Sequence, residues 1–326
     1  MIIARVIAAM LLSICLQAQA FDLQGHRGAR GLAPENTLPA FALALSIGVT
    51  TLETDIAITR DGQLVISHDP ALNPDITRGP DGHFLASRGP VIWETPFDEL
   101  QRYDVGRIKP GTRYAAQFPE QKAVDGARVP RLADLFALVK KSGNTQVRLD
   151  LETKITPTAP GETMAPEPFA RALIKAVRDA GMAGRTSIQS FDWRTLQVVQ
   201  REAPEIATVY LTAQQRWLDN VGAGRADGSP WTAGFRVAEY GSVPKMIKAA
   251  GGGTWSSYFA DLDAAKVEEA HALGLQVLAW TVSTPSQIAS VMDLGIDGIV
   301  TDRPDLVRDE MKRRGMALPA ATPVQP

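Results

Sequence analysis

The feature that most constrains the fold of this chain is a regular alternation of short β-branched runs with segments of helical period. Eight runs have the length and composition of buried strands. They are Phe21–Gln24, Thr51–Thr59, Val147–Glu152, Thr186–Ser190, Ile206–Leu211, Thr254–Tyr258, Leu275–Val282 and Gly298–Thr301. The helical segments between or after them include Thr37–Ile47, Leu132–Ser142, Phe169–Ala180, Trp193–Glu202, Ala264–Leu273, Pro285–Leu294 and Asp305–Arg314. This order predicts an α/β protein with a (β/α)₈ TIM barrel, and an open doubly wound sheet is the alternative.

Two additions follow the second predicted strand. The turn Arg60-Asp61-Gly62-Gln63 joins it to the apolar run Leu64–Ser67, and an Asp-Gly pair between such runs predicts a β-hairpin with one extra antiparallel strand. Residues 70–128 are rich in Pro, Gly, Arg and Asp. A connection of this length is usually functional, so we expect an inserted loop subdomain over a binding face of a barrel that spans residues 21–316. The Pro-containing residues 317–326 are expected to form a flexible tail.

The first twenty residues have the order of a secretory signal peptide. Arg5 precedes the apolar run Val6 to Leu16, and the small-residue triplet Ala18-Gln19-Ala20 follows. This order predicts cleavage after Ala20 and a periplasmic or secreted protein without stable membrane insertion, because the run is too short for a permanent span. The alternatives are a cytosolic protein and a lipoprotein acylated on Cys15, the only cysteine. A mature chain that starts at Phe21 would fold without disulfides.

The charge balance argues against nucleic acid as a partner. The chain has 34 Lys and Arg against 36 Asp and Glu, a formal net charge of −2. No segment gathers its basic residues into a stripe, which is the usual signature of polymer binding. A small-molecule substrate is the better expectation.

Three carboxylates are expected to meet at the C-terminal ends of the barrel strands. Glu53 and Asp55 are two residues apart in one strand, so both side chains point to the same face. Glu152 lies on the next barrel strand. A set of carboxylates without Cys favours a hard cation, Ca²⁺ or Mg²⁺, over zinc. The alternative is that the acids form ion pairs with Arg27 and Lys154.

Two of the four histidines, His26 and His68, fall at strand ends beside this acidic cluster. A histidine can accept a proton from a nucleophile or donate one to a leaving group. One on each side of a scissile bond would supply the base and the acid for displacement at phosphorus. His83 in the loop excursion and His271 within a helix are expected to be structural.

Positive charge and one aromatic side chain complete the candidate site. Arg27 and Lys154 lie at the same rim, where two cations and a divalent ion would surround one phosphate group. Trp280 ends the seventh strand. Its indole is expected either to form an apolar wall for the substrate or to be a buried core residue.

Several motifs resemble the glycerophosphodiester phosphodiesterase family, in its secreted bacterial form. They cover nearly all of the chain after residue 20 in one order. The motifs are His26-Arg27-Gly28, Pro34-Glu35-Asn36-Thr37, Leu52-Glu53-Thr54-Asp55, Asp61-Gly62, His68-Asp69, Glu152-x-Lys154, Ser190-Phe191-Asp192, Trp280-Thr281-Val282 and Gly295-x-Asp297-Gly298-Ile299-x-Thr301-Asp302-x-Pro304.

The resemblance implies a TIM barrel that cleaves glycerophosphodiesters to glycerol 3-phosphate and an alcohol, with Ca²⁺ or Mg²⁺. It implies that His26 and His68 are the catalytic pair. By the same resemblance Glu53, Asp55 and Glu152 bind the metal, and Arg27 and Lys154 contact phosphate. The attacking oxygen would come from water or from the substrate's glycerol 2-hydroxyl.

Two positions depart from the family pattern, and two other functions remain open. Asp150 and Ser283 stand where the family often has Asn. We therefore leave Asp150 outside the expected ligand set. One alternative is lysophospholipase D or sphingomyelinase D-like hydrolysis of lipids. The other is a non-catalytic periplasmic protein that binds phosphodiesters.

Overall fold

The computed structural model describes residues 20–225 and 227–326. The predicted signal peptide, apart from Ala20, lies outside these residues, and so does Cys15. Within the described part, no helix combines the length and the apolar character needed to cross a membrane.

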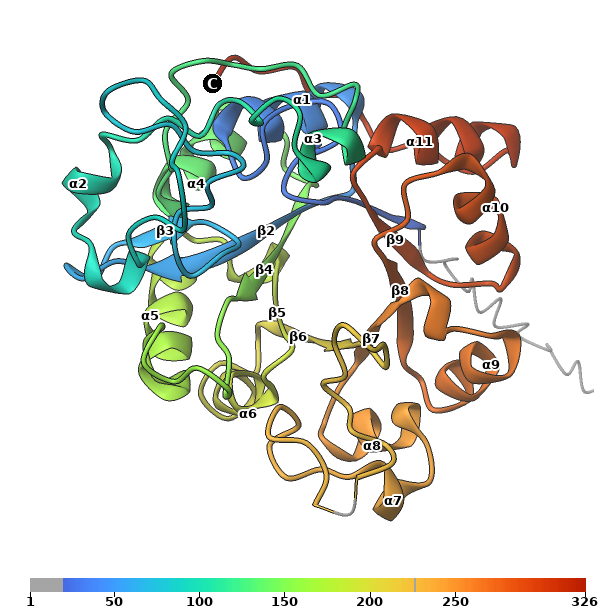
Figure 1. Cartoon of the computed structure of the whole chain (residues 1–326). Coiled ribbons are helices and arrows are strands. Elements are labelled where there is room, and N and C mark those ends of the chain that lie inside the picture. Colours follow the sequence, from blue (N-terminus) through green and yellow to red (C-terminus); the bar gives the residue numbers. More distant parts are fainter. Residues whose placement is uncertain (1–19, 226) are drawn as a thin grey trace, which may run out of the picture.

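Eight parallel strands close into a barrel, as the alternation predicts (Figure 1). They are β1 (Asp22–Gly25), β2 (Thr51–Ile58), β4 (Arg148–Thr153), β5 (Thr186–Ser190), β6 (Ala207–Thr212), β7 (Thr254–Tyr258), β8 (Gln276–Trp280) and β9 (Gly298–Thr301). The ring closes because β1 pairs in parallel with both β2 and β9. The TIM barrel is therefore confirmed, and the open doubly wound sheet is excluded.

Helices surround this ring on its outer face (Figure 1). The longer ones are α1 (Leu38–Ile47), α4 (Leu132–Lys141), α5 (Pro166–Asp179), α6 (Trp193–Glu202), α9 (Ala264–Ala272), α10 (Pro285–Asp293) and α11 (Pro304–Arg313). Short side chains cap their first turns: the Thr37 hydroxyl accepts from the Ala40 N–H, and Thr284 and Gln287 form a capping box. Such caps satisfy backbone donors that would otherwise be unpaired, so they fix where each helix begins.

Two helices between β6 and β7 were not predicted. They are α7 (Val237–Tyr240) and α8 (Val243–Ala249). Their four and seven residues are too few to show a clear helical period. Two short 3₁₀ turns also occur in the C-terminal half of the chain, η2 (Ala183–Arg185) before β5 and η3 (Phe259–Asp261) after β7.

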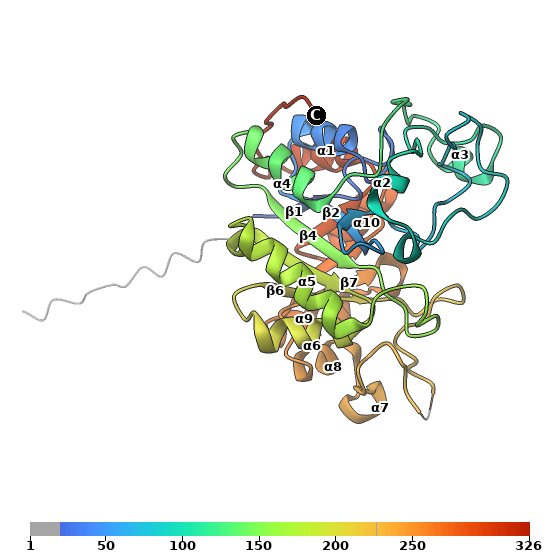
Figure 2. The same cartoon turned by 90° about the vertical axis from the view of Figure 1, so that its left-hand side faces the viewer.

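The predicted hairpin is confirmed. The strand β3 (Leu64–Ile66) pairs antiparallel with the end of β2, with Ile56 opposite Ile66. The insertion that follows contains η1 (Ile92–Glu94), α2 (Phe97–Leu100) and α3 (Arg113–Gln117). It packs against β2 and β3 through a small apolar cluster made of Ala57, Val65, Leu72, Ile92, Leu100, Val105 and Val129. Figure 2 shows the insertion at the same end of the barrel as the chain between β6 and α7.

The tail of residues 317–326 lies beside α1 in both views (Figures 1 and 2). The Thr322 N–H donates to the Leu45 carbonyl at 2.8 Å, and the Lys141 ammonium donates to the Gln325 carbonyl at 2.8 Å. The tail thus contacts the helices at the base of the barrel, and its flexibility stays a prediction.

Candidate active site

The three predicted carboxylates meet inside the mouth of the barrel. The parallel register places Asp55 of β2 opposite Glu152 of β4, and Glu53 lies one step deeper on the same face of β2. One oxygen from each of the three lies within 4.8 Å of the others, and all three side chains are buried. Alternation along β2 and pairing with β4 therefore produce the cluster that the i, i+2 spacing predicts.

Burial makes this cluster electrostatically costly without a cation. Burial and the neighbouring charge of Asp55 raise the pKa of Glu53 well above its usual range. Burial also raises the pKa of Glu152 to about 7, although Lys154 opposes the shift. Asp55 Oδ1 makes no hydrogen bond within the described residues. Clustered carboxylate oxygens of this kind suit a hard divalent cation, so the residues present fit such an ion.

The ion-pair alternative is also present, alongside the cluster. Lys154 Nζ lies 2.8 Å from Glu152 Oε1 and 3.6 Å from Asp55 Oδ1. Arg27 Nε lies 3.2 Å from Asp55 Oδ2, and Arg27 Nη1 lies 2.7 Å from Glu35 Oε1. Both cations therefore border the carboxylates and line the same cavity, where an anionic group would meet them.

A tight turn after β1 positions Arg27. Its backbone is left-handed, with φ of 50°, and the next residue, Gly28, has φ of 85°. A Cβ on Gly28 would lie 2.6 Å from the backbone carbon of Ala40, so only glycine fits against α1. In this turn the Arg27 N–H donates to Glu53 Oε2 at 2.9 Å. The turn thereby holds one carboxylate of the cluster as well as the guanidinium.

Each candidate catalytic histidine is paired with an aspartate. His26 Nδ1 lies 2.7 Å from Asp302 Oδ1, and His68 Nδ1 lies 2.7 Å from Asp69 Oδ1. An ionised carboxylate only accepts, so each Nδ1 carries the hydrogen and each Nε2 is left with a lone pair. Among the described residues, neither Nε2 takes part in a hydrogen bond. His26 Nε2 lies 3.9 Å from Glu53 Oε2.

The surroundings favour the neutral form of both imidazoles. Burial, with help from the charge of Arg30, lowers the pKa of His26 to about 4. Burial and the charges of Arg27 and Lys154 lower the pKa of His68. The pKa of Asp302 stays well below its usual range despite burial, because Arg30 and His26 stabilise its charge.

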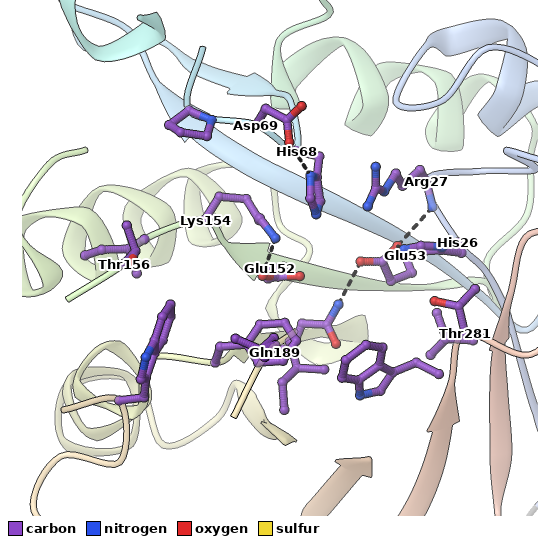
Figure 3. Close-up of a pocket in the computed structure, with 18 of the residues that line it drawn as sticks. His26, Arg27, Glu53, His68, Asp69, Glu152, Lys154, Thr156, Gln189 and Thr281 are labelled. Atoms are coloured by element: carbon purple, nitrogen blue, oxygen red, sulfur yellow. Dashed lines mark hydrogen bonds and ion pairs between the residues drawn. The ribbon is translucent and has the colours of Figure 1, made fainter. Parts of the chain in front are cut away.

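Both histidines, Arg27, Lys154, Glu53 and Glu152 border one cavity of about 410 Å³ (Figure 3). Asp55 and Asp302 contact these residues but do not line the cavity themselves. Figure 3 shows His68, Arg27 and Lys154 grouped around Glu53 and Glu152, with Gln189 below them. Trp280 also lines the cavity, and its indole N–H donates to the Ser256 carbonyl at 3.0 Å. Its side chain thus forms part of the wall.

Some neighbours of the site were given no role from the sequence, although all of them except Gln189 belong to the motifs quoted above. Asp69 and Asp302 pair with the histidines, as described above. Glu35 holds Arg27, and Gln189 Nε2 donates to Glu53 Oε1 at 2.8 Å. A carboxylate directly after a predicted strand end was the available signal for Asp69 and Asp302. Gln189 had no such signal.

Asp150 and Ser283, the two residues that depart from the family pattern, lie in different parts of the structure. Asp150 lies outside the carboxylate cluster, deeper in the barrel, where its Oδ1 accepts from the Ser187 hydroxyl at 2.7 Å. The Ser283 hydroxyl accepts from the Asp302 N–H at 3.1 Å and so helps to hold the aspartate of the His26 pair. His83 is exposed in the insertion, and His271 pairs with Asp297 at 2.9 Å. Neither lines the cavity.

Comparison with known proteins points to one family throughout. Residues 26–306 match the model of the glycerophosphoryl diester phosphodiesterase family. A glycerophosphodiester phosphodiesterase of Caldanaerobacter subterraneus is 26% identical over 290 residues, which is 89% of this chain and 97% of that protein. Human lysophospholipase D GDPD1 is 25% identical over 296 residues, 87% of this chain and 84% of the relative.

Solved structures agree with this match. A crystal structure from Silicibacter pomeroyi, named for the same family, has a TM-score of 0.82 and 35% identity, covering 92% of this chain and 96% of that one. An Oleispira antarctica phosphodiesterase, solved with the product sn-glycerol-3-phosphate, shares the fold with a TM-score of 0.63 and 22% identity, over 89% and 96% of the two chains. Since the family model spans most of the chain, this protein belongs to the glycerophosphoryl diester phosphodiesterase family and is a phosphoric diester hydrolase.

Proposed function

We propose that the protein hydrolyses glycerophosphodiesters to sn-glycerol 3-phosphate and a free alcohol, with His26 and His68 as proton carriers. The observation that carries this proposal is the pair of imidazoles at one cavity, each with Nδ1 held by an aspartate. An orienting carboxylate fixes the tautomer and leaves Nε2 for proton transfer. The family match supports the reaction class.

The carboxylates Glu53, Asp55 and Glu152 would hold one divalent cation, Ca²⁺ or Mg²⁺. When bound, such an ion neutralises charge on the phosphate oxygens and makes phosphorus more electrophilic. Arg27 and Lys154 bind the remaining phosphate oxygens and keep the diester at the mouth of the barrel. Their ion pairs with Asp55 and Glu152 hold both cations in place before substrate arrives.

The chemical step needs one base and one acid. One histidine accepts the proton of the attacking oxygen, which comes from water or from the glycerol 2-hydroxyl. In the second case this step gives a cyclic glycerol phosphate, and a water molecule then opens the ring to give glycerol 3-phosphate. As the new P–O bond forms, the bond to the leaving alcohol breaks with its electron pair on oxygen. The other histidine donates a proton to that oxygen from its protonated form, which the negative charge of the bound diester favours. Buried Asp302 and partly exposed Asp69 stabilise the imidazolium charge.

The test is the release of glycerol 3-phosphate from glycerophosphocholine by residues 21–326 after chelation, then with Ca²⁺ or Mg²⁺ restored. Activity should disappear and return with the ion. His26→Ala and His68→Ala should each lower kcat by about 10²- to 10⁴-fold. His83→Ala is the matched control, because this exposed histidine lies outside the cavity. Near-normal turnover in both cavity variants would refute the assignment.

A lipid substrate is the second candidate, favoured by the match to human lysophospholipase D GDPD1 and by the aromatic residues of the cavity. Turnover of lysophosphatidylcholine faster than that of glycerophosphocholine would select it. Saturable binding of diesters without any product would instead point to a binding protein.

We also propose that the chain is exported and cleaved after Ala20, because of the order of charged, apolar and small residues before Phe21. Intact mass of the protein from the periplasmic fraction should match residues 21–326. A full-length chain in the cytosol would contradict export, and a mass that includes an acyl group on Cys15 would indicate a lipoprotein.

A further inference from the structure

The cavity has two chemically different halves, which come from opposite arcs of the barrel. The charged groups described above lie on or directly after β1, β2, β3 and β4. The arc from β5 to β8 supplies a different set to the same cavity: Gln189, Phe191, Leu211, Trp217, Leu218, Trp231, Trp280 and Thr281. No side chain of this set is charged. We call Phe191, Trp217, Trp231 and Trp280 the aromatic wall.

Three rings of the aromatic wall, those of Phe191, Trp217 and Trp280, pack against one another. The Trp280 ring packs edge-on against Phe191, with centroids 5.3 Å apart, and 6.3 Å from Trp217. Behind them, Tyr258 lies 5.3 Å from Trp217 and 5.5 Å from Trp280. Trp217 is 61% exposed, so it forms the outer rim of the wall. An exposed indole held by neighbouring rings on a cavity is suited to ligand contact.

The aromatic wall lies directly beside Lys154, one of the two cations proposed to bind phosphate. Lys154 Nζ is 5.9 Å from the centroid of the Phe191 ring. The same ammonium group pairs with Glu152. A phosphodiester held by Lys154 therefore has one of its two alcohol groups within reach of the wall. The carboxylates lie on the other side, where hydroxyl-bearing glycerol would find oxygen partners and any cation that they hold.

The aromatic composition of the wall suits some leaving alcohols better than others. A sugar or inositol needs several hydrogen-bond partners, and a primary ammonium needs acceptors for three N–H groups. The wall offers mainly aromatic surface. A quaternary ammonium has no N–H to satisfy, and aromatic faces attract it through the ring quadrupole.

We propose that the aromatic wall is the subsite for the leaving alcohol and that it prefers an alcohol bearing a quaternary ammonium group, such as choline. This inference rests on the proposed hydrolysis of glycerophosphodiesters. It adds that glycerol lies toward the carboxylates and that the departing group lies against Phe191, Trp217 and Trp280.

The test compares two diesters that differ in one atom. Glycerophosphocholine and its 3,3-dimethylbutyl analogue have leaving groups of the same shape, but carbon replaces the charged nitrogen in the analogue. A cation–π subsite should give glycerophosphocholine a kcat/KM about tenfold higher. A ratio near one, or a faster neutral analogue, would overturn the proposal and indicate a purely apolar surface.

Variants assign the preference to the wall. Trp217→Leu keeps an apolar side chain and removes the ring, so the ratio of the two kcat/KM values should fall toward one. Trp93→Leu is the control, since Trp93 is a partly buried indole that does not line this cavity, and its ratio should equal that of the parent. An unchanged ratio in Trp217→Leu would also count against the proposal.

A binding measurement separates this inference from the reaction itself. If neither diester releases glycerol 3-phosphate, the proposed function fails, and tetramethylammonium can still be titrated into the protein. The indole N–H resonances of Trp217 and Trp280 should shift with saturation, and neutral tert-butanol should shift them far less. Equal shifts, or none, would refute the subsite even in an inactive protein.

Discussion

Asp302 is a single carboxylate shared by two groups of the active site. It lies 2.7 Å from His26 Nδ1, and it accepts from Arg30 Nε at 2.7 Å and Nη2 at 3.0 Å. Because Arg30 keeps it ionised, Asp302 can hold His26 in the tautomer that leaves Nε2 for proton transfer. We regard it as a positioning residue that acts through His26.

Replacing Asp302 with Asn should therefore lower kcat with little change in KM. We expect a loss of about 10²- to 10⁴-fold, since an amide can accept from Nδ1–H but carries no charge to stabilise the imidazolium. Steady-state kinetics across pH would check this, with a changed pH profile as the signature of an altered histidine. Asp297→Asn is the control, because it breaks the His271 pair, which lies outside the cavity. A loss in KM alone would contradict the positioning role.

Asp150 is a buried acid whose Oδ2 has no hydrogen-bond partner, and Gln24 Oε1 also lacks one. Burial raises the pKa of Asp150 to about 7. The folded protein then binds more protons than the unfolded chain between about pH 4 and pH 7, so this residue lowers stability as pH rises through that window.

Asp150→Asn should remove this effect. The amide supplies a donor to the unpartnered acceptors, so at pH 8 the variant should be more stable, by about 1–3 kcal/mol. The difference should shrink toward pH 4, and urea unfolding at both pH values would measure it. A variant that is less stable than the parent at pH 8 would show that Asp150 is paired in a way that the amide cannot replace.

At the scale of single residues, the sequence predicts which side chains form the site better than it predicts their hydrogen-bond partners. Glu53, Asp55 and Glu152 were found because strand alternation and neighbouring strands determine their meeting point. The pairing of His26 with Asp302 spans 276 positions and depends on the barrel closing. No local spacing encodes such a distant hydrogen bond.

At the scale of elements, the insertion supports the phosphate site from outside the barrel. The hydroxyl of Tyr114, on α3, donates to Glu35 Oε2, and Glu35 holds the guanidinium of Arg27. The Lys122 N–H donates to the Leu32 carbonyl at 3.0 Å in the loop after β1. The insertion therefore braces the loop that carries His26 and Arg27.

Tyr114→Phe should loosen Arg27 without removing it. The buried Glu35 loses one donor, so we expect KM to rise by about 3- to 10-fold and kcat to change less. Tyr103→Phe is the control, because it removes a hydroxyl from the same insertion, at a residue packed against the small apolar cluster. A fall in kcat with constant KM would show that α3 affects the proton carriers instead.

The sequence predicts the repeating elements well, because each has a strong internal period. The bounds of β5, β7, β9 and α6 are as predicted, and other predicted elements differ by one to a few residues at their ends. The chain between β6 and β7 was predicted least well. Its two helices are short. Trp217 and Trp231 lie outside helices and strands, and the position of Trp217 depends on packing against the distant rings of Tyr258 and Trp280.

On the scale of the whole molecule, the concentrated negative charge at the mouth of the barrel lowers the stability of the fold. Three buried carboxylates lie within 4.8 Å of one another, and Arg27 and Lys154 balance them only in part. A ligand that binds the folded state alone stabilises it by mass action. A divalent cation should therefore raise the unfolding temperature of the entire domain.

We expect this rise to be about 5 °C at saturating Ca²⁺ or Mg²⁺ after chelation. Thermal unfolding of the chelated protein, titrated with each ion, would measure it. The double variant Glu53→Gln and Asp55→Asn should show no response to either ion. An equal rise in the double variant would place the ion elsewhere.

The pairing of β1 with β9 also has a consequence for biosynthesis. Asp22 to Gly25 pair with Gly298 to Thr301, and His26 meets Asp302 at the end of this seam. The first strand to leave the ribosome thus receives its neighbour only when translation is nearly complete. A nascent or truncated chain without β9 and Asp302 lacks both the closed ring and the carboxylate that fixes the tautomer of His26, so we expect it to be inactive until synthesis is nearly complete.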